Sequence, residues 1–199
     1  MEFLNRMQGW MDSTRILDFL APLAFRIFLA PLLIMAGFGK LSGIENTATY
    51  FEFLGLPAPT LMAYLAGTTE FVGGILLLVG LAVRWAAVPL MFTMIVAAGT
   101  AHWENGWHVL PEQTLTMPWE WRGDLIDGAV ERRTMARNLL REHGNYSWLT
   151  ETGSITILKN GIEFAATYFI MLLSLFFTGA GRASIDYLVR RKFAGPEAV

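Results

Sequence analysis

The sequence predicts an all-α integral membrane protein, a four-helix bundle with an external interfacial amphipathic helix between the third and fourth spans. The 199 residues are 54% hydrophobic and 16% charged, whereas soluble domains carry more charge and less apolar surface. The mean hydropathy is +0.42. The apolar residues also gather into four blocks, and about 20 such residues cross the ~30 Å hydrocarbon core of a bilayer as a helix.

The four apolar blocks are the expected transmembrane helices, at about 19–41, 60–83, 85–102 and 155–178. Helices are expected because backbone polar groups in lipid must find partners within their own segment. Together they predict one membrane domain over 1–199, packed as a left-handed bundle. Residues 1–18 are polar and lack the features of a secretory signal, so the first block is expected to be an uncleaved anchor.

The segment at 103–154 is expected to form an external subdomain. It contains five of the seven tryptophans, and tryptophan favours the membrane–water interface. Residues 124–142 carry apolar side chains on one side and charged ones on the other, which predicts an amphipathic helix. This helix is expected to lie on the membrane or to cap the bundle.

The basic residues beside the spans predict the orientation. Arginines and lysines of the N-terminal tail, of the turn at Arg84 and of the C-terminal tail all fall on one side of a four-span protein. Basic residues close to spans favour the cytoplasmic side. Both termini are therefore expected in the cytoplasm, and the 103–154 segment outside.

Charge and cysteine content exclude several functions. The net charge of −2 offers no basic field for nucleic acid. The chain has no cysteine, which excludes disulfide relays, thiolate zinc sites and cysteine-ligated iron–sulfur clusters. No nucleotide-binding or hydrolase motif appears, so no catalytic residue is assigned and any catalysis would depend on a bound cofactor or a partner.

Ionisable residues in the apolar blocks are the candidate site residues, because charge inside a bilayer is costly and usually functional. The candidates for a polar pocket are Arg26, Lys40, Glu70 and Glu163. Two arrangements are open. Arg26 pairs with Glu70, or else Glu70, Glu163 and Lys40 form a pocket with His102 that opens to the outside.

Two structural interpretations compete with a ligand, proton or redox site. A buried ion pair can fix helix packing without adding stability. Lys40 and Lys159, near the outer ends of their spans, can also extend their ammonium groups toward water without a partner.

A second candidate site lies in the sequence AHWENGWH at 101–108. His102, Glu104 and His108 would converge in a loop to bind a metal such as copper. The alternative is a pair of hydrogen-bonded histidines beside interfacial tryptophans, since a spacing of six residues does not place both on one helical face.

One group of motifs resembles the DoxX family of small four-helix membrane proteins. It comprises Arg26, AGFGKL at 36–41, FEFLGLPAP at 51–59, EFVGGILLLVGLAVRWAA at 70–87 and Met94. The long segment with AHWENGWH resembles the subgroup found beside copper-binding peptide maturation systems. The resemblance covers over a third of the chain and implies a multi-pass protein of the bacterial inner membrane.

What the resemblance implies about activity leads to two hypotheses. In the first, the chain is a membrane component of a redox system that contacts quinone, either an oxidoreductase subunit or its partner. Arg26, Lys40 and Glu70 would line the pocket, and Glu163 would be a proton or ligand partner. In the second, it is a non-enzymatic assembly or export partner for a metal-binding peptide or protein. Quinone is the preferred cofactor and copper the less favoured one. The expected partners are membrane lipid and a protein of a redox or maturation complex.

Overall fold

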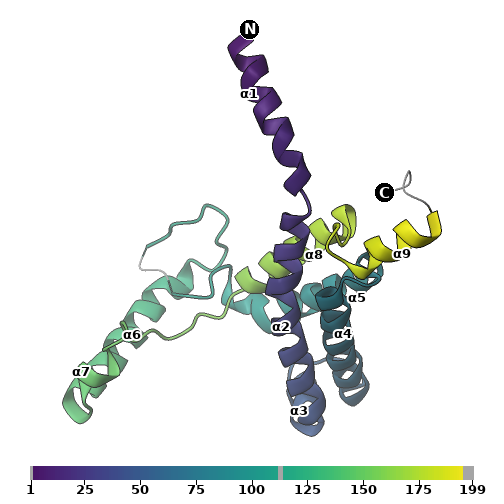
Figure 1. The fold of residues 1–199 in the computed structure, drawn as a ribbon. Coiled ribbons are helices and arrows are strands. Elements are labelled where there is room, and N and C mark those ends of the chain that lie inside the picture. Colours follow the sequence, from purple (N-terminus) through teal and green to yellow (C-terminus); the bar gives the residue numbers. More distant parts are fainter. Residues whose placement is uncertain (1, 112–113, 195–199) are drawn as a thin grey trace. The chain divides into compact units, whose positions relative to one another are not determined.

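The computed structural model describes residues 2–111 and 114–194, which form helices and contain no strand (Figure 1). Glu112 and Gln113, inside the predicted external segment, lie outside the described residues. The chain divides into two compact units. The first unit comprises Met1–Thr93 and Tyr168–Val199, and the second unit comprises Met94–Thr167.

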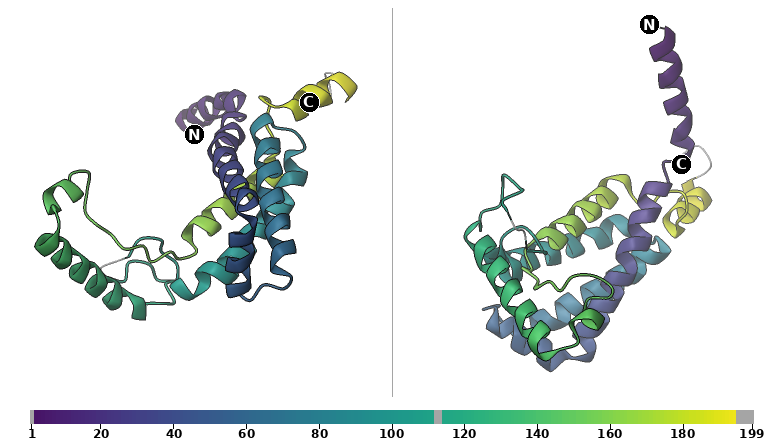
Figure 2. Two further views of the ribbon diagram at one scale, coloured as in Figure 1. Left: turned by 90° about the horizontal axis from the view of Figure 1, so that it is seen from below. Right: turned by 90° about the vertical axis from the view of Figure 1, so that its left-hand side faces the viewer.

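The first unit contains the longest apolar helices. In chain order its elements are α1 (Glu2–Ser13), a 3-10 turn (Thr14–Leu17), α2 (Leu20–Ser42), α3 (Ile44–Phe53), α4 (Pro59–Val79), most of α5 (Val83–Ala97), most of α8 (Glu163–Thr178) and α9 (Ile185–Ala194). Helices α2 and α4 pack along each other, as Figures 1 and 2 show.

The second unit holds the segment that was expected outside the membrane. It begins with the end of α5, a π-helical turn (Ala98–His102) and a 3-10 turn (Trp103–Asn105). It continues with α6 (Asp124–His143), α7 (Tyr146–Leu149) and the first turn of α8. The predicted amphipathic helix at 124–142 is therefore present as α6, with Ile126 and Ala129 buried.

Three helices in the described chain are long and apolar enough to cross a membrane: Leu20–Ser42, Pro59–Val79 and Val83–Asn105. They correspond to the first three predicted spans, although α4 ends four residues before position 83, at a left-handed Gly80. α8 is apolar but has 16 residues. The chain is thus a multi-pass membrane protein with three long candidate spans and one shorter apolar helix.

The fourth helix begins at Glu163 and not at residue 155, as the sequence predicted. The preceding residues pair their backbone with the segment after the third span. Lys159 N–H donates to Val109 O, Gly161 N–H to His108 O and Ile162 N–H to Gly106 O. A side chain at Gly161 would collide with Gly106 O at 2.5 Å. This extended pairing uses the N–H groups of residues that hydropathy alone places in a helix.

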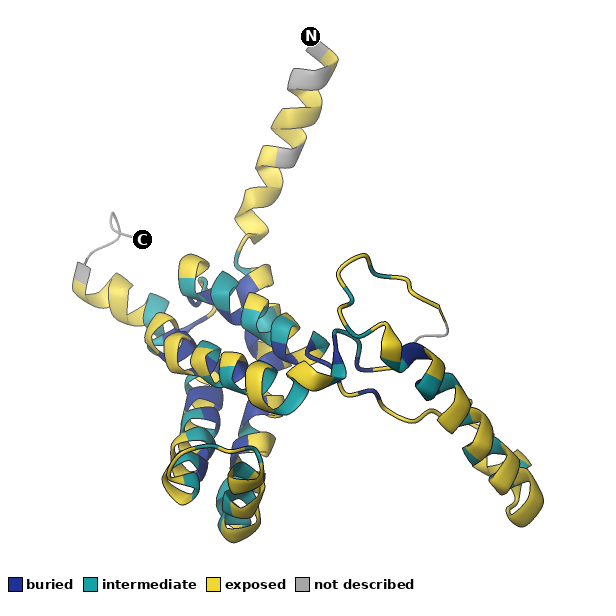
Figure 3. Cartoon of the chain, turned by 180° about the vertical axis from the view of Figure 1, so that it is seen from behind, coloured by how far each residue is buried: buried dark blue, intermediate teal, exposed yellow. Residues whose placement is uncertain are grey.

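The core of the first unit is aliphatic. Leu29 of α2, Leu77 of α4, Leu90 of α5 and Leu172 of α8 are fully buried. Outward faces of the same helices are exposed, as the colouring in Figure 3 shows. Exposed apolar side chains include Phe28 and Met35 of α2. Exposed apolar surface on this scale marks contact with a membrane or a partner, and here it lies on helices of transmembrane length.

Glycines allow α2 and α4 to approach backbone to backbone. A Cβ at Gly37 would meet Gly67 O at 2.6 Å and would also collide with the backbone N of Phe71. A Cβ at Gly74 would meet Ile34 N at 2.9 Å. Small residues at such positions permit close helix–helix packing, which replaces the hydrophobic driving force that is absent in lipid.

We expect Gly37→Ala to destabilise the first unit by about 1–3 kcal/mol, because the added methyl group has to separate two backbones. The measurement is thermal unfolding of the detergent-solubilised protein by circular dichroism. Gly39→Ala is the matched control, since nothing lies within 4 Å of its added Cβ. Equal melting temperatures for the two variants would contradict the close approach.

Candidate functional site

Arg26 lies among backbone carbonyl groups in the first unit, with 2% of its surface exposed. Its Nε donates to Leu77 O at 2.7 Å, and its Nη2 donates to Leu78 O at 3.0 Å. Its Nη1 donates to Ala180 O at 2.8 Å and to Ala183 O at 2.9 Å. Glu70 is not among these partners, so the predicted Arg26–Glu70 pair does not form.

These contacts follow from the way α4 ends. The last carbonyls of a helix lack partners within it, and cations are favoured at that end. Gly80 ends α4 with φ +70°, and a Cβ there would meet Arg26 Nη2 at 2.5 Å. The guanidinium therefore joins α2, the end of α4 and the loop before α9.

Asp186 of α9 complements Arg26 from the other side of the turn between α4 and α5. Its Oδ1 accepts from Ala82 N–H at 2.7 Å, and its Oδ2 accepts from Val83 N–H at 3.1 Å. Its own N–H donates to Gly80 O at 2.9 Å. The sequence analysis missed this residue, because an aspartate in the first turn of a C-terminal amphipathic helix carries no signal of a distant partner.

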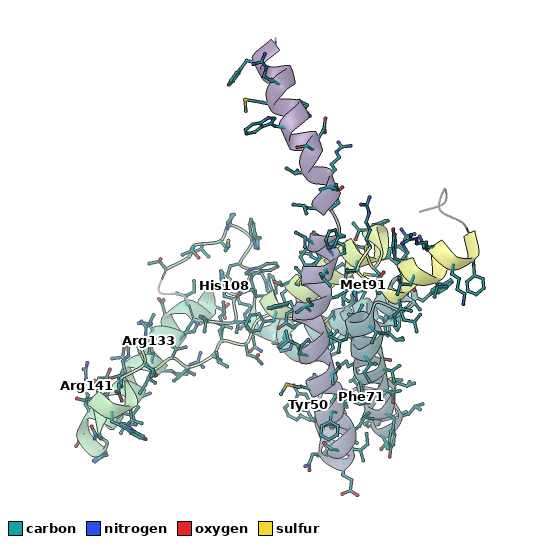
Figure 4. All side chains as sticks on the ribbon, in the orientation of Figure 1. Tyr50, Phe71, Met91, His108, Arg133 and Arg141 are labelled. Carbon is teal, nitrogen blue, oxygen red and sulfur yellow. The ribbon has the colours of Figure 1, made fainter. Side chains whose placement is uncertain are left out.

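Lys40 of α2 and Glu70 of α4 form an ion pair between two of the candidate spans. Lys40 Nζ lies 2.5 Å from Glu70 Oε2, and their side chains are 28% and 7% exposed. The rings of Phe38 and Phe71 lie beside one another at 6.4 Å between centroids; Phe71 belongs to α4 (Figure 4). The pair can donate a hydrogen bond from a partly accessible ammonium group and can hold a proton on a buried carboxylate.

Glu163 belongs to the second unit. Its Oε2 accepts from Val109 N–H at 3.0 Å and lies 3.7 Å from His108 Nδ1. Of the four residues predicted for one polar pocket, the first unit brings together Lys40 and Glu70. It places Arg26 among carbonyls instead.

The three predicted metal ligands each have a different partner. His102 Nδ1 lies 2.9 Å from Asn160 O, Glu104 pairs with Arg122 at 3.5 Å, and His108 faces Glu163. Within residues 2–111 and 114–194, no group of three or more His, Asp or Glu side chains is placed to hold a metal ion.

The sequence analysis also missed a buried ion pair in the second unit. Lys159 Nζ lies 2.6 Å from Glu120 Oε2, with side chains 4% and 0% exposed. Glu120 also accepts from Trp107 N–H at 3.1 Å and from Arg122 N–H at 2.8 Å. Lys159 thus has a carboxylate partner, in contrast to the interpretation as an unpaired lysine at a helix end.

These contacts change the acidity of Glu120. Burial alone would raise the pKa of its carboxyl group, but hydrogen bonds from Lys159 and from the two backbone N–H groups more than offset burial. The net result is a pKa below the ordinary glutamate value of 4.5.

The stacked rings of Trp103 and Trp121, whose centroids are 4.6 Å apart, lie in the same unit.

Comparisons with known proteins identify the family. The DoxX family model matches residues 21–103. The chain is 33% identical to inner membrane protein YphA of Escherichia coli K12 over 97 residues, 46% of this chain and 69% of YphA. The chain belongs to the DoxX family. The match to the family model includes Arg26, Lys40 and Glu70, whereas Glu120, Lys159, Glu163 and Asp186 lie beyond it.

A second DoxX-like relative carries a functional name. The chain is 35% identical to putative oxidoreductase CatD of Bacillus subtilis 168 over 75 residues, 38% of this chain. The match spans about half of CatD, 54% of its length. No solved structure matches the chain.

We expect Glu120→Gln to destabilise the second unit at pH 7, because it leaves the buried Lys159 ammonium without its charged partner. The cost is about 3 kcal/mol, the low end for breaking a buried pair. A carboxylate with a lowered pKa stabilises the fold above the pKa of the unfolded state, and this contribution is lost as the pH falls through the folded pKa. The difference from wild type should therefore shrink below pH 4.5.

Thermal unfolding followed by tryptophan fluorescence between pH 7 and pH 3 would measure this difference. Glu142→Gln is the control, because its side chain is 73% exposed. A difference that stays constant or grows on acidification would show that the Glu120 charge does not stabilise this unit.

Proposed function

We propose that this DoxX-family protein is a membrane component of a redox system and that the Lys40–Glu70 pair contacts a quinone. The observation that carries the proposal is an ion pair at 2.5 Å between two candidate spans, with the carboxylate buried and the ammonium group partly exposed. Ionisable residues in such segments are functional candidates by default. The relative named putative oxidoreductase CatD supports redox chemistry.

The residues around the pair fit a quinone. The Lys40 ammonium group has three N–H donors, and one of them is used on Glu70, so others can reach a quinone carbonyl oxygen. Phe71 follows Glu70 on α4, and its ring lies 6.4 Å from that of Phe38, which is 62% exposed and offers an apolar surface. A bound quinone supplies two-electron chemistry. Lys40 would orient it, Glu70 would hold a proton at Oε2, and a partner protein of the redox complex would supply the electrons.

We propose four membrane spans, with α8 as the fourth, in one membrane domain. Leu172 and Leu175 of α8 are fully buried within the first unit, as a bundle helix requires. Its 16 residues are ~24 Å long, a mismatch that local bilayer thinning accommodates. The relative YphA is named an inner membrane protein. We place both termini in the cytoplasm and α6 outside, at the membrane surface.

We expect Glu70→Gln to weaken quinone retention about tenfold, because the neutral amide no longer holds the Lys40 ammonium group toward the site. Native mass spectrometry of the protein in a mild detergent, with ubiquinone and menaquinone as added probes, would measure the adduct. Glu52→Gln is the matched control, since Glu52 is exposed on α3.

Protein yield and melting temperature separate this role from a structural one. A quinone adduct lost by Glu70→Gln at unchanged yield supports the site. Folded protein and adduct lost in parallel would show that the pair only fixes helix packing, and a wild type without any quinone adduct would overturn the proposal.

The orientation has a direct test, because the chain has no native cysteine. We expect Ser147→Cys, exposed on α7, to react in whole cells with a membrane-impermeant maleimide. Arg191→Cys, exposed on α9, should react only after the cells are opened. The opposite pattern would invert the proposed topology.

A second candidate function is that of an assembly or export partner that binds a metal-binding peptide. The second unit favours it, because Trp103, Trp119 and Trp148 are more than half exposed and aromatic residues are enriched at protein interfaces. Under this function, deleting residues 107–121 abolishes peptide capture while Glu70→Gln is tolerated.

A further inference from the structure

A basic pocket lies in the first unit where α8 ends and α9 begins. It has a volume of about 250 Å³. Three arginines line it: Arg84 from α5, Arg182 from the loop and Arg190 from α9. Asp186 and Ser184 complete the polar lining. Neither the quinone proposal nor the family match to residues 21–103 accounts for Arg182 and Arg190.

The negative charge in the pocket is already engaged. Both carboxylate oxygens of Asp186 accept from backbone N–H groups of the turn between α4 and α5. Arg84 Nη2 donates to Phe177 O at 3.0 Å. The other N–H groups of Arg84 remain available to a ligand. Arg182 and Arg190 form no hydrogen bond or ion pair with the part of the chain that the structure describes. Within residues 2–111 and 114–194, the guanidinium groups of Arg182 and Arg190 therefore have no carboxylate partner.

The wall of the pocket is held in place by the fold. Arg26 binds Ala180 O and Ala183 O, on either side of Arg182. Gly179 and Gly181 have φ values of +78° and +74°, a region that favours glycine. A Cβ at Gly179 would meet Arg84 Nε at 3.3 Å. Gly179 both permits the loop and leaves room for the Arg84 guanidinium group, so the backbone fixes this part of the wall.

Apolar side chains next in sequence to lining residues, or one turn from them, are exposed. Phe177 of α8, Trp85 of α5 and Leu188 of α9 are 68%, 81% and 62% exposed. The pocket lies next to the ends of two membrane helices, where the interface between lipid and water is expected. Guanidinium groups bind phosphate through several parallel hydrogen bonds, and basic clusters beside spans attract anionic lipids.

We propose that this pocket binds the phosphate group of an anionic phospholipid. The arginines would contact the phosphate oxygens, and the acyl chains would cover the exposed apolar side chains of α5, α8 and α9. A soluble phosphate compound can also contact the arginines, but it has no acyl chains to cover the exposed apolar side chains. The lipid is therefore the occupant that uses both features.

Lipid binding to the full-length protein in a neutral detergent tests this. Native mass spectrometry would compare phosphatidylglycerol with phosphatidylcholine of the same acyl chains. We expect wild type to retain phosphatidylglycerol preferentially. Arg182→Gln combined with Arg190→Gln should weaken that retention about tenfold, since two charge-assisted contacts are lost.

The matched control removes the same amount of charge from α9, at positions outside the pocket lining. Arg191→Gln combined with Lys192→Gln leaves the pocket lining intact and should change retention less than about threefold, a shift of surface charge alone. If the pocket variant fails to match the wild-type melting temperature without lipid, Arg190→Gln alone, at an exposed position, replaces it.

Three outcomes would overturn the proposal. The first is equal retention of the two lipids by wild type. The second is equal loss in the pocket and control variants, which would show diffuse attraction. The third is displacement of phosphatidylglycerol by inorganic phosphate at millimolar concentration, which would identify a free phosphate as the occupant. Preferential retention that depends on Arg182 and Arg190 supports the lipid site.

Discussion

A guanidinium group buried in the interior of a protein needs partners for its N–H donors, and the fold of the first unit depends on how Arg26 finds them. Its partners are four backbone carbonyls, two at the end of α4 and two in the loop before α9. The last carbonyls of a helix have no partner within it, so the carbonyls at the end of α4 also gain from this donor. Asp186 does the converse for the N–H groups that open α5. Arg26 thus supplies donors to the carbonyl groups at the end of α4, and Asp186 accepts from the N–H groups at the start of α5.

Whether the backbone uses the hydrogen-bonding capacity of a charged side chain also separates structural from candidate functional charges elsewhere in the chain. Glu120 accepts from two backbone N–H groups besides Lys159, so its role in organising the second unit is evident. Lys40 and Glu70 differ, since each has the other as its polar side-chain partner in the described chain. Their remaining hydrogen-bonding capacity is not used by the backbone, which is why this pair is the better candidate for a ligand.

The fold was predictable where the determining signal is local. Hydropathy predicted the three long spans, and amphipathic spacing predicted α6 at nearly its observed bounds. Hydropathy failed at the start of α8, where an apolar stretch pairs its backbone with residues about fifty positions earlier. It also extended α4 past Gly80, because apolar residues continue beyond the left-handed turn that ends the helix.

The candidate site was only partly predictable for a related reason. Lys40 and Glu70 were found because charge is conspicuous in an apolar span. The partners of Arg26 are backbone carbonyls, which have no sequence signature. Glu120 and Lys159 are separated by 39 positions in a segment where charge is ordinary, so nothing in the sequence pairs them.

The packing of α2 against α4 limits how a ligand can reach the Lys40–Glu70 pair. Glu70 lies between Gly67 and Gly74 on α4, and both glycines are in close contact with α2. A Cβ at Gly67 would meet the Leu41 side chain at 2.9 Å and Lys40 Cβ at 3.3 Å. The two helices therefore leave no room for a ring between their backbones. Access is left on the side of the helix pair where the Lys40 side chain is 28% exposed. A ligand that dissolves in the membrane can approach from that side without separating the helices.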